Sequence, residues 1–576
     1  MLAARADDSS RPLRPIVSFG ALAFVLALRL VQLSSAVQSP LTYQPGPDED
    51  YYLRFGEAVA AGTGQYSSEF TFMDPAYGYV LGALFKLVGV NLFAVYALQC
   101  LLDSATAFGI LTIGRLLGRP RAGLYGALLY GITTVALMFC TTLLKEVWVT
   151  AFVTWWVVCA LSIMRSQRKL AWLAYGAYCG LGVAFRSTLL LAVFLALLIP
   201  LFGETLAGLK LANPLRKSLL IACGATLALI PWSVRNHHAF GGISPLPHNG
   251  GVVLHQLYNE KNPGSSIWVP DFVNYLHPSE IWRGYAAEAS KREGRTLGPI
   301  EVDRYWKGEA LGYMLHNPAR VLEGMWQKLL KFFSATEIPI NRSLSEERMF
   351  SPLLDWIPAP APWLLGLGIA GLIWLGFEDR RWPIVAAPIF IALVTVVFFF
   401  AEDRFRFHAM AVLALCAGCG IDLLVRNIAA RRKRPVLIFT AIAGSVGAVS
   451  IALGGANPPP PIRWDHIVWG YINMGKMAQA RILAERIAAE QPQNGPILEA
   501  LGYTAAAGGQ YAEAARDFQR AIEIRPRSHV AHYNLAKALL ELNDRHGAAA
   551  EARIAMSLYP SPQYQALLAQ IGSDKQ

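Results

Sequence analysis

Long apolar stretches alternate with short polar segments over roughly the first four-fifths of the chain. A bilayer core about 30 Å thick is crossed by a helix of roughly 20 apolar residues. The pattern therefore predicts about eleven membrane-spanning helices, near residues 15–37, 90–114, 122–142, 147–164, 170–185, 188–203, 218–234, 362–377, 382–400, 408–425 and 435–454. A shorter apolar piece at 75–89 predicts an interfacial or re-entrant helix. We expect an all-α polytopic membrane domain over residues 1–456, with extracytoplasmic loops at about 38–89 and 235–360.

Composition agrees with a membrane protein and excludes several other classes. Of the 576 residues, 54% are hydrophobic and only 16% are charged, whereas soluble domains carry about 25% charged residues. This deficit argues against a single soluble domain and against a disordered chain. The net charge of +11 would suggest nucleic-acid binding in a soluble protein. Here the basic residues stand in short runs between apolar stretches, which is typical of membrane proteins.

These basic runs also predict how the chain is oriented. They precede the first predicted span and follow every second one: Arg5, Arg11, Arg14, Arg115, Arg119, Arg121, Arg165, Arg168, Lys169, Lys210, Arg216, Lys217, Arg380, Arg381, Arg426, Arg431, Arg432, Lys433 and Arg434. Because short loops rich in Lys and Arg stay in the cytoplasm, we expect a cytoplasmic amino terminus and an extracytoplasmic carboxy-terminal region. The first span is long for a signal peptide and predicts an uncleaved anchor. We expect an integral, multi-pass protein of the cell (inner) membrane.

A proline-rich segment at 457–462 predicts a stiff linker to a second domain over residues 463–576. This domain repeats every 34 residues, as its equivalent positions show: Pro492, Pro526 and Pro560; Ala480, Ala514 and Ala548; and, at the turn, Gly475, Gly509 and Asn543. The period resembles that of the tetratricopeptide repeat, a pair of helices. Such repeats stack into an α-solenoid with a concave binding surface, so we expect a protein or peptide partner.

Strong polar clusters gather on the predicted outer side of the membrane and come from several loops. They are Asp48, Glu49 and Asp50; Lys145 and Glu146; Arg186; Arg235 and Asn236; and Glu402, Asp403, Arg404, Arg406 and His408. Charges at membrane depth are costly and usually functional. Carboxylates suit hydroxyl activation or a metal, and arginines grip phosphate with two parallel hydrogen bonds. Together they predict chemistry on a lipid phosphate.

Each polar group also has a simpler interpretation. The acidic run at 48–50 is also typical of a solvated loop start. Arg404 and Arg406 would equally suit snorkelling to lipid headgroups, and Arg235 would suit capping of a helix end. The histidines of the long outer loop lack the regular spacing of zinc ligands: His237, His238, His248 and His255.

Four segments, in family order, resemble motifs of the GT-C glycosyltransferases. The first comprises PDEDYYLRFGEAVAAGTG and DPAYGYVLGALFKLVG, and it is followed by LGVAFRSTLLL, PWSVRNHHAFGGISPLPHNGGVVL and EDRFRFHAMAVLALCAGCGI. The resemblance covers roughly residues 15–425 and is nearest to the dolichyl-phosphate-mannose protein mannosyltransferases and the bacterial aminoarabinose lipid A transferases. It implies a GT-C-like membrane domain, a donor sugar linked to a polyprenyl phosphate, inversion at the anomeric carbon, and an extracytoplasmic active site.

The same resemblance implies roles for individual residues. Asp48 and Glu49 are the implied catalytic pair: Asp48 matches the acidic residue that acts as general base, and Glu49 is its neighbour in the acidic pair. The implied substrate-binding residues, whose arginines are candidates for the donor phosphate, are Tyr51, Asp74, Tyr77, Glu146, Arg186, Arg235, Asn236, Arg404 and Arg406. His408 departs from the family, whose members often have proline there. The sequence requires no cofactor, although some relatives use a divalent metal ion near the acidic pair.

These features predict a membrane glycosyltransferase that moves a hexosyl or pentosyl group from a polyprenyl-phosphate sugar to a hydroxyl of a glycan, lipid or protein acceptor. Two alternatives stay open at this stage. An oligosaccharide or O-antigen-type ligase also combines many spans with outer repeats, but the early acidic pair argues against it. A non-enzymatic transporter or envelope scaffold would show interrupted helices at mid-membrane, whereas here the charges gather at one face.

Overall fold

The computed structural model describes residues 13–208, 212–262, 268–273, 277–339, 341–455 and 461–573. The described residues form helices and connecting segments, with no strand beyond an isolated bridge between Asn259 and Asn262. The all-α prediction is confirmed. Three of the basic residues used for orientation, Arg5, Arg11 and Lys210, lie outside the described residues.

The chain divides into two compact units. The membrane unit contains Met1–Val37 and Gly46–Pro460, and the repeat unit contains Gln38–Pro45 and Pro461–Gln576. Most of the predicted linker, residues 457–460, lies outside the described part of the chain.

Seven helices within the described ranges are long and apolar enough to cross a membrane, so the chain is an integral membrane protein. They are α1 (Pro15–Ala36), α4 (Leu92–Leu116), α7 (Glu146–Ile163), α11 (Pro214–Phe240), α18 (Ala361–Glu378), α20 (Asp403–Ala429) and α21 (Lys433–Gly455). The pair α5 (Pro120–Gly131) and α6 (Thr134–Cys140) would make an eighth span, bent by 63° at the break. All of these coincide with predicted spans.

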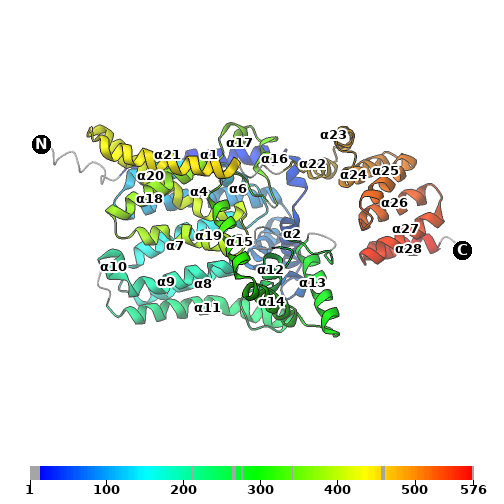
Figure 1. Ribbon diagram of the computed structural model, residues 1–576, viewed down its shortest axis with the longest axis horizontal. Helices are drawn as coiled ribbons and strands as arrows, with labels where there is room; N and C mark the ends of the chain where they lie inside the picture. Colours follow the sequence, from blue (N-terminus) through cyan, green and yellow to red (C-terminus); the bar gives the residue numbers. More distant parts are fainter. Residues whose placement is uncertain are drawn as a thin grey trace. The chain divides into compact units, whose positions relative to one another are not determined.

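The other three predicted spans coincide with shorter helices, so the number eleven is not confirmed. These helices are α8 (Lys169–Phe185), α9 (Leu190–Leu201) and α19 (Trp382–Phe398). At 17, 12 and 17 residues, each falls short of the roughly 20 residues that span a bilayer. Figure 1 shows α8, α9 and α11 side by side, and both shorter helices pack against α11.

Small residues let the membrane helices pack closely around α20, which contacts α5, α18 and α19. A Cβ atom at Gly418 of α20 would lie 2.2 Å from the carbonyl oxygen of Ala122 on α5, and one at Gly371 of α18 would lie 1.9 Å from that of Cys416. Only glycine allows such an approach, the usual basis of helix association in membranes. The packing fixes the amino-terminal end of α20, where Glu402, Arg404 and Arg406 lie.

The long loops fold into shorter helices. The first loop forms η2 (Pro40–Tyr43), α2 (Pro47–Ala60), η3 (Ser68–Phe70) and α3 (Ala76–Val88). The second forms α12 (Gly250–Leu257), α13 (Pro278–Glu293), α14 (Pro299–His316), α15 (Pro318–Phe333), α16 (Leu344–Arg348) and α17 (Pro352–Trp356). The remaining short helices are η4 (Ser187–Leu189) and α10 (Gly203–Ala207). With 13 residues, α3 has the short length that its sequence predicts.

In the repeat unit, the 34-residue period gives pairs of helices. These are α22 (Trp464–Asn473) with α23 (Met477–Glu490), α24 (Gly495–Ala507) with α25 (Tyr511–Ile524), and α26 (His529–Glu541) with α27 (Arg545–Leu558), followed by α28 (Pro562–Ser573). Gly475, Gly509 and Asn543 adopt φ values of 74°, 75° and 63° at the turns inside the pairs. This left-handed backbone favours glycine and asparagine, which explains the predicted turn positions.

The segment Gln38–Pro45 packs within the repeat unit although it directly precedes α2 in the chain. The side-chain amide of Asn473 on α22 donates hydrogen bonds to the carbonyl oxygen of Tyr43 and to Oε1 of Gln44, both at 2.9 Å. A Cβ at Gly470 would lie 2.2 Å from the carbonyl oxygen of Pro40. Residues 38–45 are therefore part of the packed core of the repeat unit.

Candidate functional site

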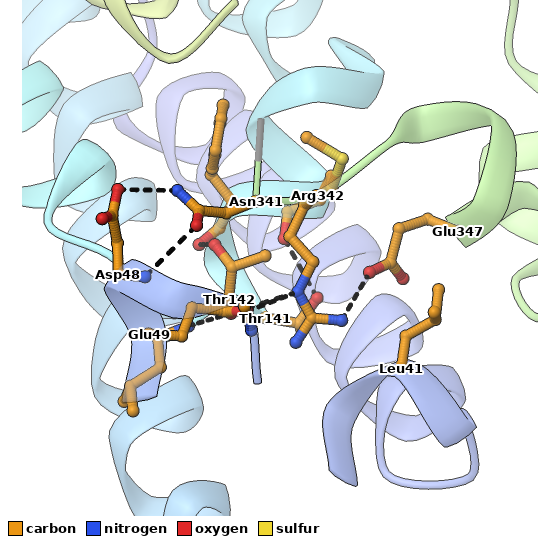
Figure 2. Close-up of polar contacts among 12 residues, drawn as sticks. Leu41, Asp48, Glu49, Thr141, Thr142, Asn341, Arg342 and Glu347 are labelled. Carbon is orange, nitrogen blue, oxygen red and sulfur yellow. Dashed lines mark hydrogen bonds and ion pairs between the residues drawn. The ribbon is translucent and has the colours of Figure 1, made fainter. Parts of the chain in front are cut away.

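The amino terminus of α2 carries the predicted acidic pair. Pro47 occupies the first turn, and the acidic side chains that follow it favour a helix amino terminus because of the helix dipole. Figure 2 shows that Asp48 and Glu49 turn toward different partners. The Asp48 side chain keeps 15% of its exposed area and that of Glu49 only 1%. Of the two, only Asp48 is accessible to a substrate.

Asp48 is held by one cation and one amide. Its carboxylate forms an ion pair with Arg404 and accepts a hydrogen bond from Nδ2 of Asn341 at 2.8 Å. The backbone N–H of Asp48 donates to Oδ1 of the same amide at 3.3 Å. Arg404 also pairs through Nε with Glu402, at 2.6 Å. The carboxylate is therefore oriented by two side chains, Arg404 and Asn341, from distant parts of the chain.

Glu49 is closed in by hydrogen-bond donors. It accepts from the backbone N–H groups of Gly46 at 2.7 Å and Leu143 at 3.1 Å. Nε of Arg342 lies 3.1 Å from both of its carboxylate oxygens, and Arg342 also pairs with Glu347 at 3.2 Å. Figure 2 shows this chain of contacts. The geometry favours a role for Glu49 in fixing α2, rather than the catalytic role that the sequence suggests.

Arg186 and Arg404 lie over the same aromatic ring, that of Phe405, at 4.7 and 5.1 Å from its centre. Arg186 pairs with Glu146 at 2.5 Å. Nε of Arg186 and Oε2 of Glu146 are buried and have no hydrogen-bond partner among the described residues. Since buried polar atoms are normally satisfied, this pair has unused capacity for a ligand.

Asp74 and Lys145 form a third ion pair beside these two. Lys145 Nζ lies 2.5 Å from Oδ2 of Asp74 and over the ring of Tyr52, 5.6 Å from its centre. The backbone N–H of Ser187 also donates to Asp74, at 3.1 Å. Five segments far apart in the sequence thus meet: the start of α2, the residues before α3, the start of α7, the residues after α8, and the start of α20.

The charges of these groups set the ionisation of Asp48. Burial raises the pKa of Asp48, but Arg404, the Asn341 hydrogen bond and Lys145 together outweigh burial and bring the pKa below its ordinary value. Burial likewise raises the pKa of Glu402, and in that case Arg404 only partly opposes it. Burial lowers the pKa of Lys145 in spite of its partner Asp74. Asp48 is therefore ionised at neutral pH, as a general base must be.

Arg235 and Asn236 lie at the end of α11 and hold neighbouring backbone. Arg235 donates to the carbonyl oxygen of Phe70 at 2.6 Å and to the Asn236 side chain at 3.0 Å. The Asn236 amide donates to the carbonyl oxygens of Ser244 and Leu246. None of these contacts reaches Asp48, but Nε of Arg235 is buried without a partner among the described residues.

Tyr51, Tyr77 and Arg406 are engaged in structural contacts. The Tyr51 hydroxyl accepts from the backbone N–H of Met73 at 3.3 Å, and that of Tyr77 donates to Gln99 at 2.8 Å. Both tyrosines are fully buried. Arg406 pairs with Asp403 and donates to backbone carbonyl oxygens between residues 331 and 336. Its guanidinium therefore anchors this segment, whereas Arg404 reaches Asp48.

Asn341 and Arg342 are functional candidates that the sequence does not single out. They lie 293 residues from their partners Asp48 and Glu49. The only local signal is a polar Asn-Arg-Ser run in a long loop, which is also typical of ordinary loops. Lys145 and Glu402 belong to the predicted outer polar clusters, and the structure adds a specific partner for each.

A divalent ion near the acidic pair stays an untested prediction. No group of three or more His, Cys, Asp and Glu side chains able to hold a metal occurs among the described residues. The carboxylates of Asp48 and Glu49 already face guanidinium groups, which would repel a cation. The residues present do not fit a metal at this pair.

Comparisons with known proteins agree with this picture. Residues 74–235 match the family described as dolichyl-phosphate-mannose-protein mannosyltransferase, and residues 505–571 match the tetratricopeptide repeat. The first match begins at Asp74 and ends at Arg235, so it includes Lys145, Glu146 and Arg186. No curated protein sequence matches the chain.

Solved structures of the oligosaccharyltransferase of Archaeoglobus fulgidus are also similar. The apo form is 13% identical, with a TM-score of 0.42, and the match covers 78% of this chain and 57% of that one. Its complex with an inhibitory peptide and a dolichol-phosphate gives the same identity and coverage and a TM-score of 0.38. The chain thus spans little more than half the length of these proteins. The two family matches agree with the resemblance found in the sequence: residues 74–235 are similar to the mannosyltransferase family of the GT-C type, and residues 505–571 are similar to the tetratricopeptide repeat.

Proposed function

We propose that the protein is an extracytoplasmic glycosyltransferase that moves one sugar from a polyprenyl-phosphate donor to an acceptor hydroxyl. The observation that carries the proposal is the carboxylate of Asp48, partly exposed and oriented by Arg404 and Asn341. Beside it, at the ends of apolar helices, lie Lys145 and Arg186. A base next to several cations at membrane depth suits attack on a sugar whose leaving group is a lipid phosphate.

The proposed reaction balances as a single displacement. Asp48 takes the proton of the acceptor hydroxyl while the hydroxyl oxygen bonds to the anomeric carbon. The bond from that carbon to the phosphate oxygen breaks, and the lipid phosphate leaves with the electron pair. Attack from the opposite face inverts the anomeric centre. Arg404, Arg186 and Lys145 stabilise the charge that the phosphate gains.

Arg404 has two roles in this proposal, because it contacts Asp48 in the free protein and would contact phosphate in the complex. Phosphate binding would draw the guanidinium away from the carboxylate. Since Arg404 lowers the pKa of Asp48 against the effect of burial, loss of this contact raises the proton affinity of the base. Donor binding would thus make Asp48 a stronger base.

Replacing Arg404 with Met should move the acidic limb of the pH–activity profile upward by about one to three pH units, the usual effect of one neighbouring charge. The sign follows from burial, which raises the pKa of Asp48 once the cation is gone. The measurement is kcat and KM for donor lipid between pH 4 and pH 9. Arg404→Lys keeps the charge and should shift the limb less. The limb in kcat/KM reports the free protein, in which Arg404 contacts Asp48, so an unmoved kcat/KM limb in Arg404→Met would contradict the pairing.

The orientation is part of the proposal: the amino terminus is cytoplasmic, and Asp48 and the repeats are extracytoplasmic. This would place the base where a lipid-linked donor is available and no nucleotide is needed. The repeat unit would bind a protein or peptide that brings or selects the acceptor.

The direct test compares cells with and without the protein. Mass spectrometry should find a polyprenyl-phosphate sugar that accumulates without the protein and an envelope glycan that lacks one sugar. A missing block of several sugars would favour the ligase alternative, because a ligase moves a preassembled glycan. Unchanged glycolipids and glycans would contradict both enzymatic functions.

A further inference from the structure

The long outer loop encloses a cavity of about 640 Å³, within the size range of ligand sites. Its walls come from α12, from residues 268–272, from α13 and from α14. Figure 1 shows α12, α13 and α14 grouped in one region of the membrane unit. The residues of the candidate active site do not line it.

Aromatic side chains pack behind one wall of the cavity, which is formed by Phe272. Phe272 stacks on Trp306 with ring centres 5.8 Å apart, and Tyr285 meets Trp306 edge to face at 4.9 Å. Trp306 and Tyr285 are fully buried. On another wall, Tyr258 donates to the carbonyl oxygen of Phe398 and accepts from a lysine. The shape of the cavity is therefore set by the fold before any ligand binds.

One wall, formed by α14, leaves room for a ligand. Gly308 and Gly312 lie one turn apart on this helix, and a Cβ atom at either would meet nothing within 4 Å. Beside them, the hydroxyl of Tyr313 is buried and has no hydrogen-bond partner among the described residues. A buried hydroxyl is normally satisfied, so this wall offers both space and an unused hydrogen-bonding group.

The charges around the cavity nearly balance. Three acidic residues (Glu260, Asp271 and Glu309) and two basic residues (Lys261 and Arg292) line it. Lys261 and Asp271 pair with each other at 3.3 Å. Burial and the nearby Arg292 lower the pKa of His255 to about 4, so this imidazole is neutral at pH 7. Since neither sign dominates, the cavity favours a neutral ligand over a phosphate.

Polar and aromatic side chains both line the cavity, which suits a molecule with hydroxyl groups on an apolar frame. Carboxylate, amide and hydroxyl groups come from Glu309, Asn317 and Tyr313, and aromatic faces come from Trp268 and Phe272. An extended peptide would bind best along a strand edge, and the described walls consist of helices and short connecting segments. A sugar needs no such edge.

We propose that this cavity binds a neutral saccharide portion of the acceptor, an inference that rests on the proposed function. A structural link joins it to the candidate active site. Asp50, two residues after the base, contacts Nε2 of His277 at 3.4 Å. His277 caps the amino terminus of α13, the helix that carries Arg292. The helix that positions Asp48 thus also anchors a wall of the cavity.

The test fills the cavity without touching the base. Gly312→Leu and Gly308→Leu extend a side chain into the open space along α14, and Gly312→Ala is the matched control that leaves most of that space empty. The full chain is placed in lipid nanodiscs free of sugar detergents. Saturation-transfer NMR then measures binding of neutral trisaccharides of glucose, galactose and mannose, with phosphorylated trisaccharides and a neutral hexapeptide as further probes.

At least one neutral trisaccharide should bind saturably to the unaltered protein and to Gly312→Ala, and at least tenfold more weakly to both leucine variants. Thermal unfolding should show that all variants are folded. Absence of trisaccharide binding, equal binding in both leucine variants, or preference for the phosphorylated or peptide probe would overturn the proposal. The readout needs no donor lipid, so a failure of donor binding with trisaccharide binding intact would count against the proposed function and not against the cavity.

Discussion

Replacing Asp48 with Asn is expected to lower the rate of sugar transfer by about 10²- to 10⁴-fold, the usual contribution of a general base. The amide keeps the size of the side chain and its contact with Asn341, but it takes up no proton. Because Asp48 is still 15% exposed, the change should leave folding intact. Initial rates with excess donor and acceptor, together with donor affinity, measure the effect.

The control for this variant lies on the same helix. Glu57 is an exposed carboxylate on α2, and Glu57→Gln makes the same chemical change away from the base. It should transfer sugar at the normal rate. Turnover near normal in Asp48→Asn would reject Asp48 as the base.

Replacing Glu49 with Gln should instead destabilise the membrane unit, by about 3–5 kcal/mol as for other broken buried ion pairs. The partners around its carboxylate are donors: the N–H groups of Gly46 and Leu143 and the guanidinium of Arg342. The NH₂ group of glutamine would face one of these donors and leave it unsatisfied. The midpoint of thermal unfolding in nanodiscs measures the loss.

A double-mutant cycle separates the structural role from a catalytic one. Arg342→Met alone should lower the free energy of unfolding. Because the two residues are in contact, the double variant with Glu49→Gln and Arg342→Met should lose less free energy of unfolding than the sum of the two single losses. A Glu49→Gln protein of normal stability that has lost transfer would show that Glu49 acts in catalysis after all.

The local sequence predicts the helix that carries Asp48 and Glu49, but not the different environments of the two carboxylates. The sequence predicts a helix start with both carboxylates near the membrane, since the proline, the acidic first turn and the span before it are local features. It offers no means to tell Asp48 from Glu49, because their partners at 341 and 342 lie 293 residues away. Their different burial follows from those distant contacts.

The two arginines at the start of α20 also differ in their partners, although they are close together in the sequence. Residues two positions apart on a helix point roughly 200° apart, so Arg404 and Arg406 face different neighbours. Arg404 reaches Asp48, and Arg406 reaches Asp403 and the carbonyl oxygens of the segment after α15. The sequence predicts both for the donor phosphate, and the packing of α20 among its neighbours brings Arg404, and not Arg406, to Asp48.

The sequence by itself determined the properties that repeat over short distances: the all-helical class, the membrane character, the approximate places of the apolar helices, and the 34-residue period with its turns at Gly475, Gly509 and Asn543. Hydrophobic periodicity and turn-forming residues act over a few neighbouring positions, so both can be recognised in a single sequence. The tertiary structure alone decided which charges meet at Asp48, which are used in anchoring backbone, and where the long loop encloses a cavity. Those outcomes depend on contacts between residues far apart in the chain, which local patterns do not encode.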